Sequence, residues 1–378
     1  MARLGDVCDI LNGFAFKSEQ YVGDGIRIIR IANVQKGYIE DSAPVFYPCD
    51  SKEAKKYRLE ENDMLMSLTG NVGRVATLSK EFLPAALNQR VACLRIKDGI
   101  VLDKAFLFNL LNSDYFEQQC IAASKGVAQK NMSTDWLKEY EIPMFPLEQQ
   151  KAIAAVLDKV SELISLRKQQ LVKLDDLVKA RFVELFGNCK NMVALNDLCS
   201  IITDGTHQPP KFQSEGIPFI FVSNLANNTV TYNAEKFISE ETYSELIKRT
   251  PIEVGDILLS TVGSYGHPAV VVEERKFLFQ RHIAYLKPKH DLVNSFYLHS
   301  ALLAPDGQRQ IEEKVKGIAQ KTLNLSDIRK IMIPIPSIEE QNAFELFIKQ
   351  TDKSTLEVQK SLDKLETLKK ALMQKYFG

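Results

Sequence analysis

Residues 147–186 read LEQQKAIAAVLDKVSELISLRKQQLVKLDDLVKARFVELF. Pro143 and Pro146 precede this stretch and Gly187 follows it. This pattern predicts a helix, because proline suits the first turn and glycine suits the position past the last turn. Apolar side chains recur at steps of three, four and seven residues, at Ile153, Leu157, Val160, Ile164, Leu171, Leu174, Val178 and Leu185. Such a helix spans about 60 Å, and its heptad-like seam requires a partner helix.

The partner helix is predicted in the same chain. Residues 338–377 read IEEQNAFELFIKQTDKSTLEVQKSLDKLETLKKALMQKYF. A shift of 191 positions (378 − 187) superposes Gln150 on Gln341 and Gly187 on Gly378. Two like helices pack most simply by pseudo-two-fold symmetry, so the sequence predicts an antiparallel coiled coil.

The repeat extends into the segment that precedes each helix. LGDVC at 4–8 matches LNDLC at 195–199, IIRIANV at 28–34 matches FIFVSNL at 219–225, and DMLMS at 63–67 matches DILLS at 256–260. These apolar runs predict short buried strands. A G-x-x-G turn follows at 70–73 and 263–266, and 103–124 and 294–315 are expected to be helical. The predicted fold is a tandem pair of α/β (α+β) domains joined by the two long helices.

We expect four segments along the chain. Residues 1–142 and 188–333 are the two globular domains, and 143–187 and 334–378 are the two long helices. An antiparallel helix pair sends the two domains to opposite ends of one rod, which would measure a fixed distance between two contacts. Duplex DNA offers contacts of this kind, since half-sites one helical turn apart are separated by roughly 34–36 Å.

Composition narrows the function classes. No apolar run approaches about 18 residues and the sequence after Met1 is polar, so we expect no membrane span, no signal peptide and a cytoplasmic location. The six cysteines form no CxxC pair, and the repeat equivalents Cys8 and Cys199 are expected to be buried small residues rather than metal or redox sites. The 48 basic and 48 acidic residues argue against indiscriminate polyanion binding but permit local basic loops.

Two further motifs stand in both copies in the same order. IPMFPLEQ at 142–149 and IPIPSIEEQ at 333–341 lead into the long helices, and the loops KGVAQK at 125–130 and KGIAQK at 316–321 precede them. This ordered set, which covers the whole chain, resembles the DNA-specificity (S) subunits of Type I restriction–modification systems. One departure is the longer gap between Pro143 and Pro146 than between Pro334 and Pro336.

The resemblance implies a non-catalytic DNA-recognition and assembly subunit. It implies two target-recognition domains, each reading one half of a split sequence in double-stranded DNA. The helical spacer would dock two modification (methyltransferase) subunits and, through them, restriction (helicase–nuclease) subunits. The directed reaction would be adenine N6-methylation, with S-adenosylmethionine held by the partner methyltransferase and no cofactor in this chain.

The sequence leaves two rival interpretations. It contains no Asn-Pro-Pro-Tyr-like motif and no phosphate-binding loop, and no acid, base, nucleophile or metal-ligand cluster recurs in both halves, so an enzyme is the weaker rival. The stronger rival is a coiled-coil protein scaffold with two protein-binding heads and no nucleic acid, which the neutral net charge would suit. The paired KGxAQK loops distinguish the two, because a protein adaptor does not need them.

These loops supply the first candidate DNA contacts. Lysines suit phosphate oxygens, and glutamine amides suit base edges, with adenine as the usual bidentate partner. The candidates are Lys125, Gln129 and Lys130 in the first copy and Lys316, Gln320 and Lys321 in the second. The alternative is a solvated loop without a ligand.

The remaining candidates lie in two other segments of each copy. Asn71, Arg74, Ser264 and His267 lie in or beside the G-x-x-G turns, which are typical of strand-to-strand turns but also allow backbone to approach DNA. Lys17, Thr206, His207 and Lys211 lie in the segment that differs most between the copies. Different half-sites would require such divergence, although surface loops also diverge without it. Gln89-Arg90 and Gln280-Arg281 are expected to hold loops in place, with base contact as the alternative, and Trp136 is expected to pack.

Overall fold

The computed structural model describes residues 1–97, 99, 101–124, 131–317 and 320–378. The chain divides into two compact units, Met1–Arg167 with Ser361–Gly378, and Lys168–Lys360. Each unit contains one globular domain and a stretch of both long helices. The four-segment division expected from the sequence follows the order of the chain, whereas these units follow packing.

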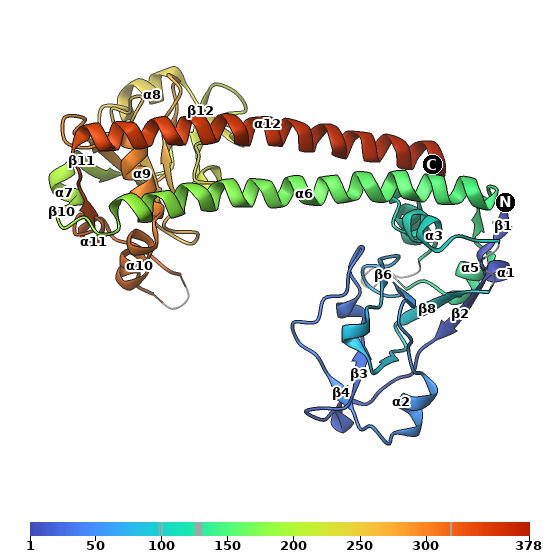
Figure 1. Cartoon of the computed structure of the whole chain (residues 1–378). Coiled ribbons are helices and arrows are strands. Elements are labelled where there is room, and N and C mark those ends of the chain that lie inside the picture. The colour runs from blue at the N-terminus through green and yellow to red at the C-terminus, as the bar shows by residue number, and fades with distance from the viewer. Residues whose placement is uncertain (98, 100, 125–130, 318–319) are drawn as a thin grey trace. The chain divides into compact units, whose positions relative to one another are not determined.

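The two predicted long helices are present as unbroken helices of 40 residues each, α6 (Leu147–Phe186) and α12 (Ile338–Phe377) (Figure 1). In the first unit, Leu157 near the start of α6 shares a core with Phe377 at the end of α12. In the second unit, Phe186 at the end of α6 shares a core with Phe344 near the start of α12. Within each unit the helices therefore run antiparallel, as predicted.

The predicted seam is wrong at the end of α6. Leu185 is 46% exposed, whereas Phe182 and Phe186 are each 4% exposed. Here α6 packs onto the second domain as well as onto α12: the Phe182 ring lies 5.3 Å from that of Tyr297 and 5.6 Å from that of Phe344. The buried side chains follow steps of four residues because a straight helix packed on a domain keeps a 3.6-residue period.

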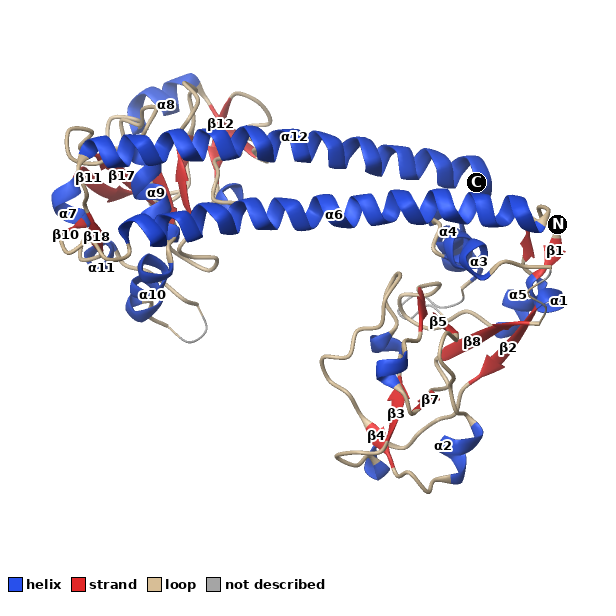
Figure 2. Cartoon of the chain, in the orientation of Figure 1, coloured by secondary structure: helices blue, strands red, loops and turns tan. Residues whose placement is uncertain are grey.

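The globular domain of the first unit is built on a four-stranded antiparallel sheet in the order β2-β8-β5-β6 (Figure 2). Its strands are β2 (Cys8–Asn12), β8 (Val91–Ile96), β5 (Met64–Ser67) and β6 (Val75–Thr77). A smaller sheet has the order β4 (Phe46–Tyr47), β3 (Ile26–Ile29), β7 (Ala85–Leu87), and β1 (Ala2–Arg3) pairs with β9 (Glu141–Ile142). The α-helices are α1 (Leu4–Val7), α2 (Lys52–Lys56), α3 (Lys104–Leu111), α4 (Asp114–Ala123) and α5 (Thr134–Glu139), with 3-10 turns η1 (Ser18–Gln20), η2 (Ile31–Asn33) and η3 (Lys80–Phe82).

The second unit repeats this plan. Its four-stranded sheet has the order β11 (Cys199–Asp204), β17 (Ile283–Pro288), β14 (Ile257–Ser260), β15 (Pro268–Val270). The smaller sheet has the order β13 (Lys236–Ile238), β12 (Ile217–Ile220), β16 (Leu278–Phe279), and β10 (Met192–Ala194) pairs with β18 (Met332–Pro334). The helices are α7 (Leu195–Leu198), α8 (Glu240–Leu246), α9 (Ser295–Leu303), α10 (Pro305–Lys314) and α11 (Leu325–Ile328), with the 3-10 turn η4 (Val222–Leu225).

The apolar strands of each larger sheet are buried on both faces. In β14 all four residues are buried: Ile257 and Leu259 join the core shared with the helices, and Leu258 joins the core shared with the smaller sheet. In β5, Met64 and Met66 join one core and Leu65 the other. Successive strand residues point to opposite faces, so a continuous apolar run is what a strand between two cores requires.

The predicted strands at 28–34 and 219–225 are too long. β3 ends at Ile29 and β12 at Ile220, and a 3-10 turn follows each. The repeated asparagines cause the turns: Asn33 Oδ1 accepts from Arg30 N at 2.8 Å, and Asn224 Oδ1 accepts from Phe221 N at 2.9 Å. Asparagine side chains bond nearby backbone in this way and compete with the strand ladder.

Candidate nucleic-acid interface

The interface candidates of the second unit gather at one end of the larger sheet. β11 and β14 both end beside the start of β17, since Asp204 pairs with Ala284 and Ser260 with Ile283. The connecting segments therefore emerge at the same end. We call segments 205–207, 261–267, 280–282 and 316–322, as far as they are described, the loop edge of the second unit.

The KGIAQK loop meets the G-x-x-G turn at this edge. Lys316 and Thr322 exchange backbone hydrogen bonds at 2.9 and 2.8 Å, which closes the loop. Gly263 N donates to the Lys321 carbonyl at 3.1 Å, and the Lys321 ammonium lies 5.7 Å from the centre of the Tyr265 ring. Two motifs more than 50 positions apart in the sequence thus form one surface.

The side chains of this loop differ in their freedom. Lys316 Nζ pairs with Asp327 Oδ2 at 3.2 Å, and this lysine hydrogen bond lowers the pKa of the Asp327 carboxyl. Lys316 remains 70% exposed, and Gln320 and Lys321 are also exposed. Gly317 has φ +100°, and a Cβ there would lie 2.3 Å from the Gln320 carbonyl oxygen, so the loop requires glycine at this position.

In the first unit, the residues that follow the KGVAQK sequence are held next to the G-x-x-G turn. Asn131 forms a bridge with Thr69, and Met132 N donates to the Leu68 carbonyl at 2.8 Å. These contacts lead the chain past the G-x-x-G turn at 70–73. The candidates Lys125, Gln129 and Lys130 lie outside the described residues.

Both G-x-x-G motifs are tight turns whose glycines have positive φ. The values are 70° and 80° at Gly70 and Gly73, and 75° and 79° at Gly263 and Gly266. Within the turns Asn71 and Ser264 are exposed. The glycines therefore serve the backbone, and the residue after the first glycine of each turn carries an exposed side chain, whereas Val72 is buried.

The residues just after the turns are partly buried and held by neighbours. Arg74 Nη1 donates to Gln35 Oε1, and His267 Nδ1 lies 3.0 Å from Asn228 Oδ1. Both side chains therefore have partners within their own domain.

The candidate residues of the segment that differs most between the copies lie in two different places. Thr206 lies at the loop edge, where its carbonyl accepts from Arg281 N at 3.1 Å. His207 follows it, with Nε2 at 2.9 Å from Asp204 Oδ2. Lys17 and Lys211 are exposed beside Phe16 and Phe212, which pack with the smaller sheets, and no contact within the described part of the chain brings these two lysines to the loop edge.

The structure adds basic residues that the sequence reasoning missed. Lys248 and Arg249, after α8, line a cleft of about 370 Å³ with Thr206 and His207. Arg249 Nη2 pairs with Asp204 Oδ1 at 2.6 Å. The signal in the sequence was a pair of consecutive basic residues in the corresponding place of each copy, Lys55-Lys56 and Lys248-Arg249.

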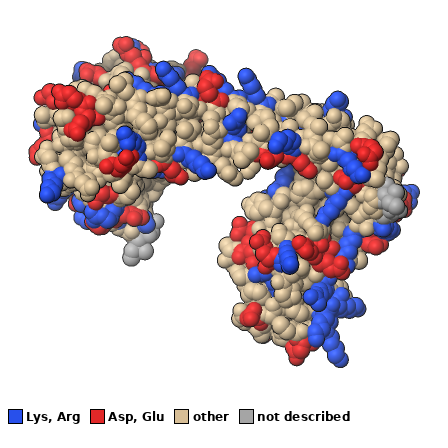
Figure 3. All heavy atoms as spheres, in the orientation of Figure 1, with Lys and Arg blue, Asp and Glu red and all other residues tan. Residues whose placement is uncertain are grey.

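In the first unit the corresponding basic residues lie on α2. Figure 3 shows Lys and Arg gathered over this helix, where Lys52, Lys55 and Lys56 are exposed. The chain leaves α2 through Tyr57, whose ring stacks on Phe14 at 5.4 Å. Because Phe14 forms a bridge with Asn88, this basic helix lies beside the segment that carries Gln89 and Arg90.

At the loop edge, the protonated form of His282 is disfavoured. Burial lowers the pKa of His282, and the adjacent Arg281 lowers it further. Exposed lysine and arginine side chains therefore supply the positive charge here: Arg281, Lys316 and Lys321 lie in the loop edge, and Lys248 lines the adjoining cleft.

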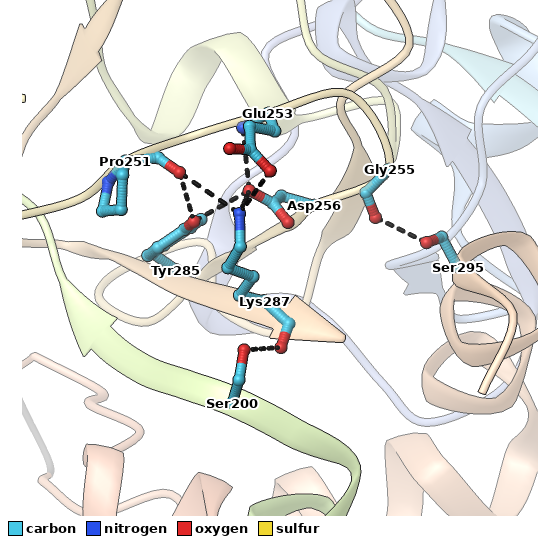
Figure 4. A network of polar contacts seen from close by, with 8 residues as sticks. All are labelled: Ser200, Pro251, Glu253, Gly255, Asp256, Tyr285, Lys287 and Ser295. Carbon is cyan, nitrogen blue, oxygen red and sulfur yellow. Dashed lines mark hydrogen bonds and ion pairs between the residues drawn. The ribbon is translucent and has the colours of Figure 1, made fainter. Parts of the chain in front are cut away.

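The opposite end of the larger sheet is closed by a polar network (Figure 4). Asp256, 1% exposed, accepts from Tyr285 at 2.8 Å and from Glu253 N at 2.8 Å, and lies 3.5 Å from Lys287 Nζ. Burial raises the pKa of Asp256, although these bonds oppose the shift. In the first unit Asp63 instead takes two bonds from Arg95, at 2.7 and 2.8 Å. These carboxylates brace the sheet and are not accessible to a ligand.

In the described part of the chain, no group of three or more His, Cys, Asp or Glu side chains is placed to hold a metal ion. Burial raises the pKa of Cys8 and Cys199 to about 12, so these thiols stay protonated. Among the described helices, none combines the length and the apolar character that crossing a membrane needs.

Comparison with known proteins identifies the family. The profile of the Type I restriction modification DNA specificity domain matches residues 1–175 and 190–370. The chain is 26% identical over 413 residues to the Type I restriction enzyme EcoBI specificity subunit of Escherichia coli, covering 99% of this chain and 84% of that protein. It is 35% identical over 167 residues to the EcoAI specificity subunit of Escherichia coli, covering 43% of this chain and 28% of that protein.

Solved structures share the fold. A chain from a structure of a type I R-M system has a TM-score of 0.62 at 19% identity, covering 100% of this chain and 96% of that one. The S subunit of the Type-I restriction-modification system from M. genitalium has a TM-score of 0.52 at 17% identity, covering 100% and 95%. The profile match, the whole-chain relative and the tandem fold agree: the chain belongs to the Type I restriction–modification specificity subunit family.

Proposed function

We propose that the chain reads a two-part target in double-stranded DNA, one part with each globular domain, and has no catalytic site of its own. The observation that carries this proposal is the loop edge. In each unit the G-x-x-G turn, the segment before β8 or β17 and the anchor of the KGxAQK loop converge at one end of a rigid sheet. Convergent polar segments on such a scaffold are typical of binding sites.

The residue types at the loop edge suit the two kinds of DNA contact. Lys321, Lys248 and Arg281 would contact phosphates, which position the protein on the duplex. His207, Ser264 and Gln320 would reach base edges, which supply specificity. The candidates of the first unit, including Asn71 and the loop at 125–130, would act in the same way on the other half-site.

The partners follow from the family and remain part of the proposal. Two modification subunits would dock on the helix pair and hold the S-adenosylmethionine used for adenine N6-methylation, and restriction subunits would join through them. This assembly would work in the cytoplasm. The rival scaffold function lacks support, because the chain belongs to a DNA-specificity family and carries the KGxAQK sequence in both copies.

The test is methylation by the chain with and without its modification subunit. The pair should methylate a single two-part motif, found by sequencing methylated bases genome-wide in cells that express both. The purified chain alone should transfer no labelled methyl group from S-adenosylmethionine. Transfer by the chain alone would refute the non-catalytic role, and a pair that forms without DNA binding would favour the scaffold.

A further inference from the structure

A buried glutamine occupies the first turn of each long helix. Gln150 in α6 and Gln341 in α12 are both 0% exposed. They are repeat equivalents, 191 positions apart. A side-chain amide is costly to bury unless its donors and acceptor are satisfied, so its partners show what it does.

Gln150 bonds three backbone groups of its own domain. Its Oε1 accepts from Asp103 N at 2.9 Å, and its Nε2 donates to the carbonyl oxygens of Val101 at 3.0 Å and Phe145 at 2.8 Å. Asp103 is the N-cap of α3, where its carboxylate accepts from Phe106 N at 2.8 Å. One amide thus ties the root of α6 to the start of a domain helix and to the Ile-Pro segment that leads into α6.

Gln341 makes the equivalent bonds in the second unit. Its Oε1 accepts from Asn294 N at 2.9 Å, and its Nε2 donates to the carbonyls of Leu292 at 3.2 Å and Pro336 at 3.1 Å. Each partner stands 191 positions after its counterpart in the first unit. The partner residues differ between the copies and the glutamine does not, because all six bonds reach backbone atoms, which every residue type supplies.

These bonds constrain direction in a way that apolar packing does not. Leu157 and Phe106 hold α6 against the first domain by burial, which is not directional. A hydrogen bond weakens steeply as its angle departs from linear, so three bonds to two segments, 101–103 and the approach to α6, restrict the angle at which the helix leaves the domain. A tilt of 5° at the root of a helix of about 60 Å moves its far end by about 5 Å, which exceeds one base-pair step of about 3.4 Å.

We propose that Gln150 and Gln341 are positioning residues that fix the angle between each recognition domain and its long helix, and so restrict the target to one gap length between half-sites. This inference rests on the proposed two-part DNA reading. The length of the gap would then depend on the angle at the start of each long helix as well as on the length of the helix. It leaves the choice of bases to the loop edges.

The test replaces each glutamine separately in the full chain, co-expressed with its modification subunit. Gln150→Met and Gln341→Met preserve length but lose the amide bonds. Methylated bases are mapped genome-wide, and the gap distribution is compared with that of the wild type. The half-site bases should stay unchanged, while methylation at gaps one base pair longer or shorter should rise several-fold.

Matched controls separate positioning from general damage. Gln149→Met and Gln350→Met change exposed glutamines of the same helices and should keep the single gap. A purely structural role would lower methylation at every site by one factor and leave the gap distribution unchanged. That result in folded protein would overturn the proposal.

Folding is checked by thermal unfolding of each purified variant. If the methionine variants do not fold, Gln150→Glu and Gln341→Glu take their place, since they keep side-chain size and the acceptor for Asp103 N or Asn294 N. Failure of all four variants to fold would show that the amide is required for the fold itself and would also overturn the proposal. A wild type that methylates no two-part motif would refute the underlying function, whereas a fixed gap in both wild type and variants would refute only this inference.

Discussion

Lengthening both long helices by one heptad should lengthen the unread gap in the DNA target. The insertion points are after Leu171 and after Leu362, which are repeat equivalents. Among the described residues, none between Leu157 and Val178 in α6, or between Ile348 and Leu372 in α12, belongs to the main apolar core of either globular domain, so both insertions avoid these two cores. Duplicating residues 165–171 and 356–362 adds one heptad to each helix, which preserves the seven-residue pattern of the seam.

The expected increment follows from helix geometry. Seven residues add about 10 Å at about 1.5 Å per residue. Along B-DNA this is at most about three base pairs at roughly 3.4 Å per step, and fewer if the rod lies oblique to the DNA axis. Seven residues also turn a straight helix by only about 20°, whereas each base pair turns DNA by about 35°. The gap should therefore grow by one to three base pairs. Methylation should be reduced at gaps where the rotation of the DNA between the half-sites does not match the rotation that the longer helices impose.

The assay maps methylated bases in cells that carry the lengthened chain and its modification subunit. The half-site bases should be those of the wild type, and only the gap should change. Duplication in one helix alone is the control: it breaks the pairing and should reduce methylation at every site. An unchanged gap in the doubly lengthened chain, or altered half-site bases, would show that the helices do not set the spacing.

Further predictions concern the loop edge, the chain ends and the buried carboxylates Asp63 and Asp256. Replacing Lys321 or its first-copy counterpart Lys130 with alanine should weaken binding to all DNA sequences. Each change should also lower the slope of the logarithm of the DNA-binding constant against the logarithm of salt concentration by about one unit. A changed target motif at unchanged affinity would contradict the role in phosphate contact. Changes at Gln129 or Gln320 should alter discrimination at one base position by roughly 1–3 kcal/mol, measured with substituted duplexes. A circular permutant cut at 188–191, with Gly378 linked to Met1, should keep its methylation motif, since both termini belong to the first unit; a changed motif would argue against the pseudo-symmetric plan. Asp63→Asn should lower the free energy of unfolding by about 1–2 kcal/mol, because it loses the two hydrogen bonds between the carboxylate and Arg95. Asp256→Asn should lower it by less, because burial already favours the uncharged form of Asp256. Equal losses of unfolding free energy in urea titrations would contradict this difference.

Some features of the chain could be read from residues near one another in sequence. α6 matches the predicted 147–186 because its period, its prolines and its terminal glycine are local signals. The G-x-x-G turns could be predicted because positive φ favours glycine wherever the strands lie. The local signals were weaker at Leu185, where a seven-residue step predicted burial, and at Ile31–Asn33, where an asparagine ends the strand.

The sequence by itself determined the duplicated plan, the two long helices and the family, because a repeat at constant offset and helical periodicity need no knowledge of distant contacts. Only the tertiary structure decided which motifs meet. Strand pairing brings Thr206, Ser264 and Lys321 to one edge, adds Arg249, and leaves Lys17 and Lys211 beside the smaller sheets. It also buries Gln150 and Gln341 against backbone atoms whose side chains differ between copies. Such contacts depend on which strands and helix starts become neighbours in the fold. The sequence next to each of these residues does not indicate which distant segment it will contact.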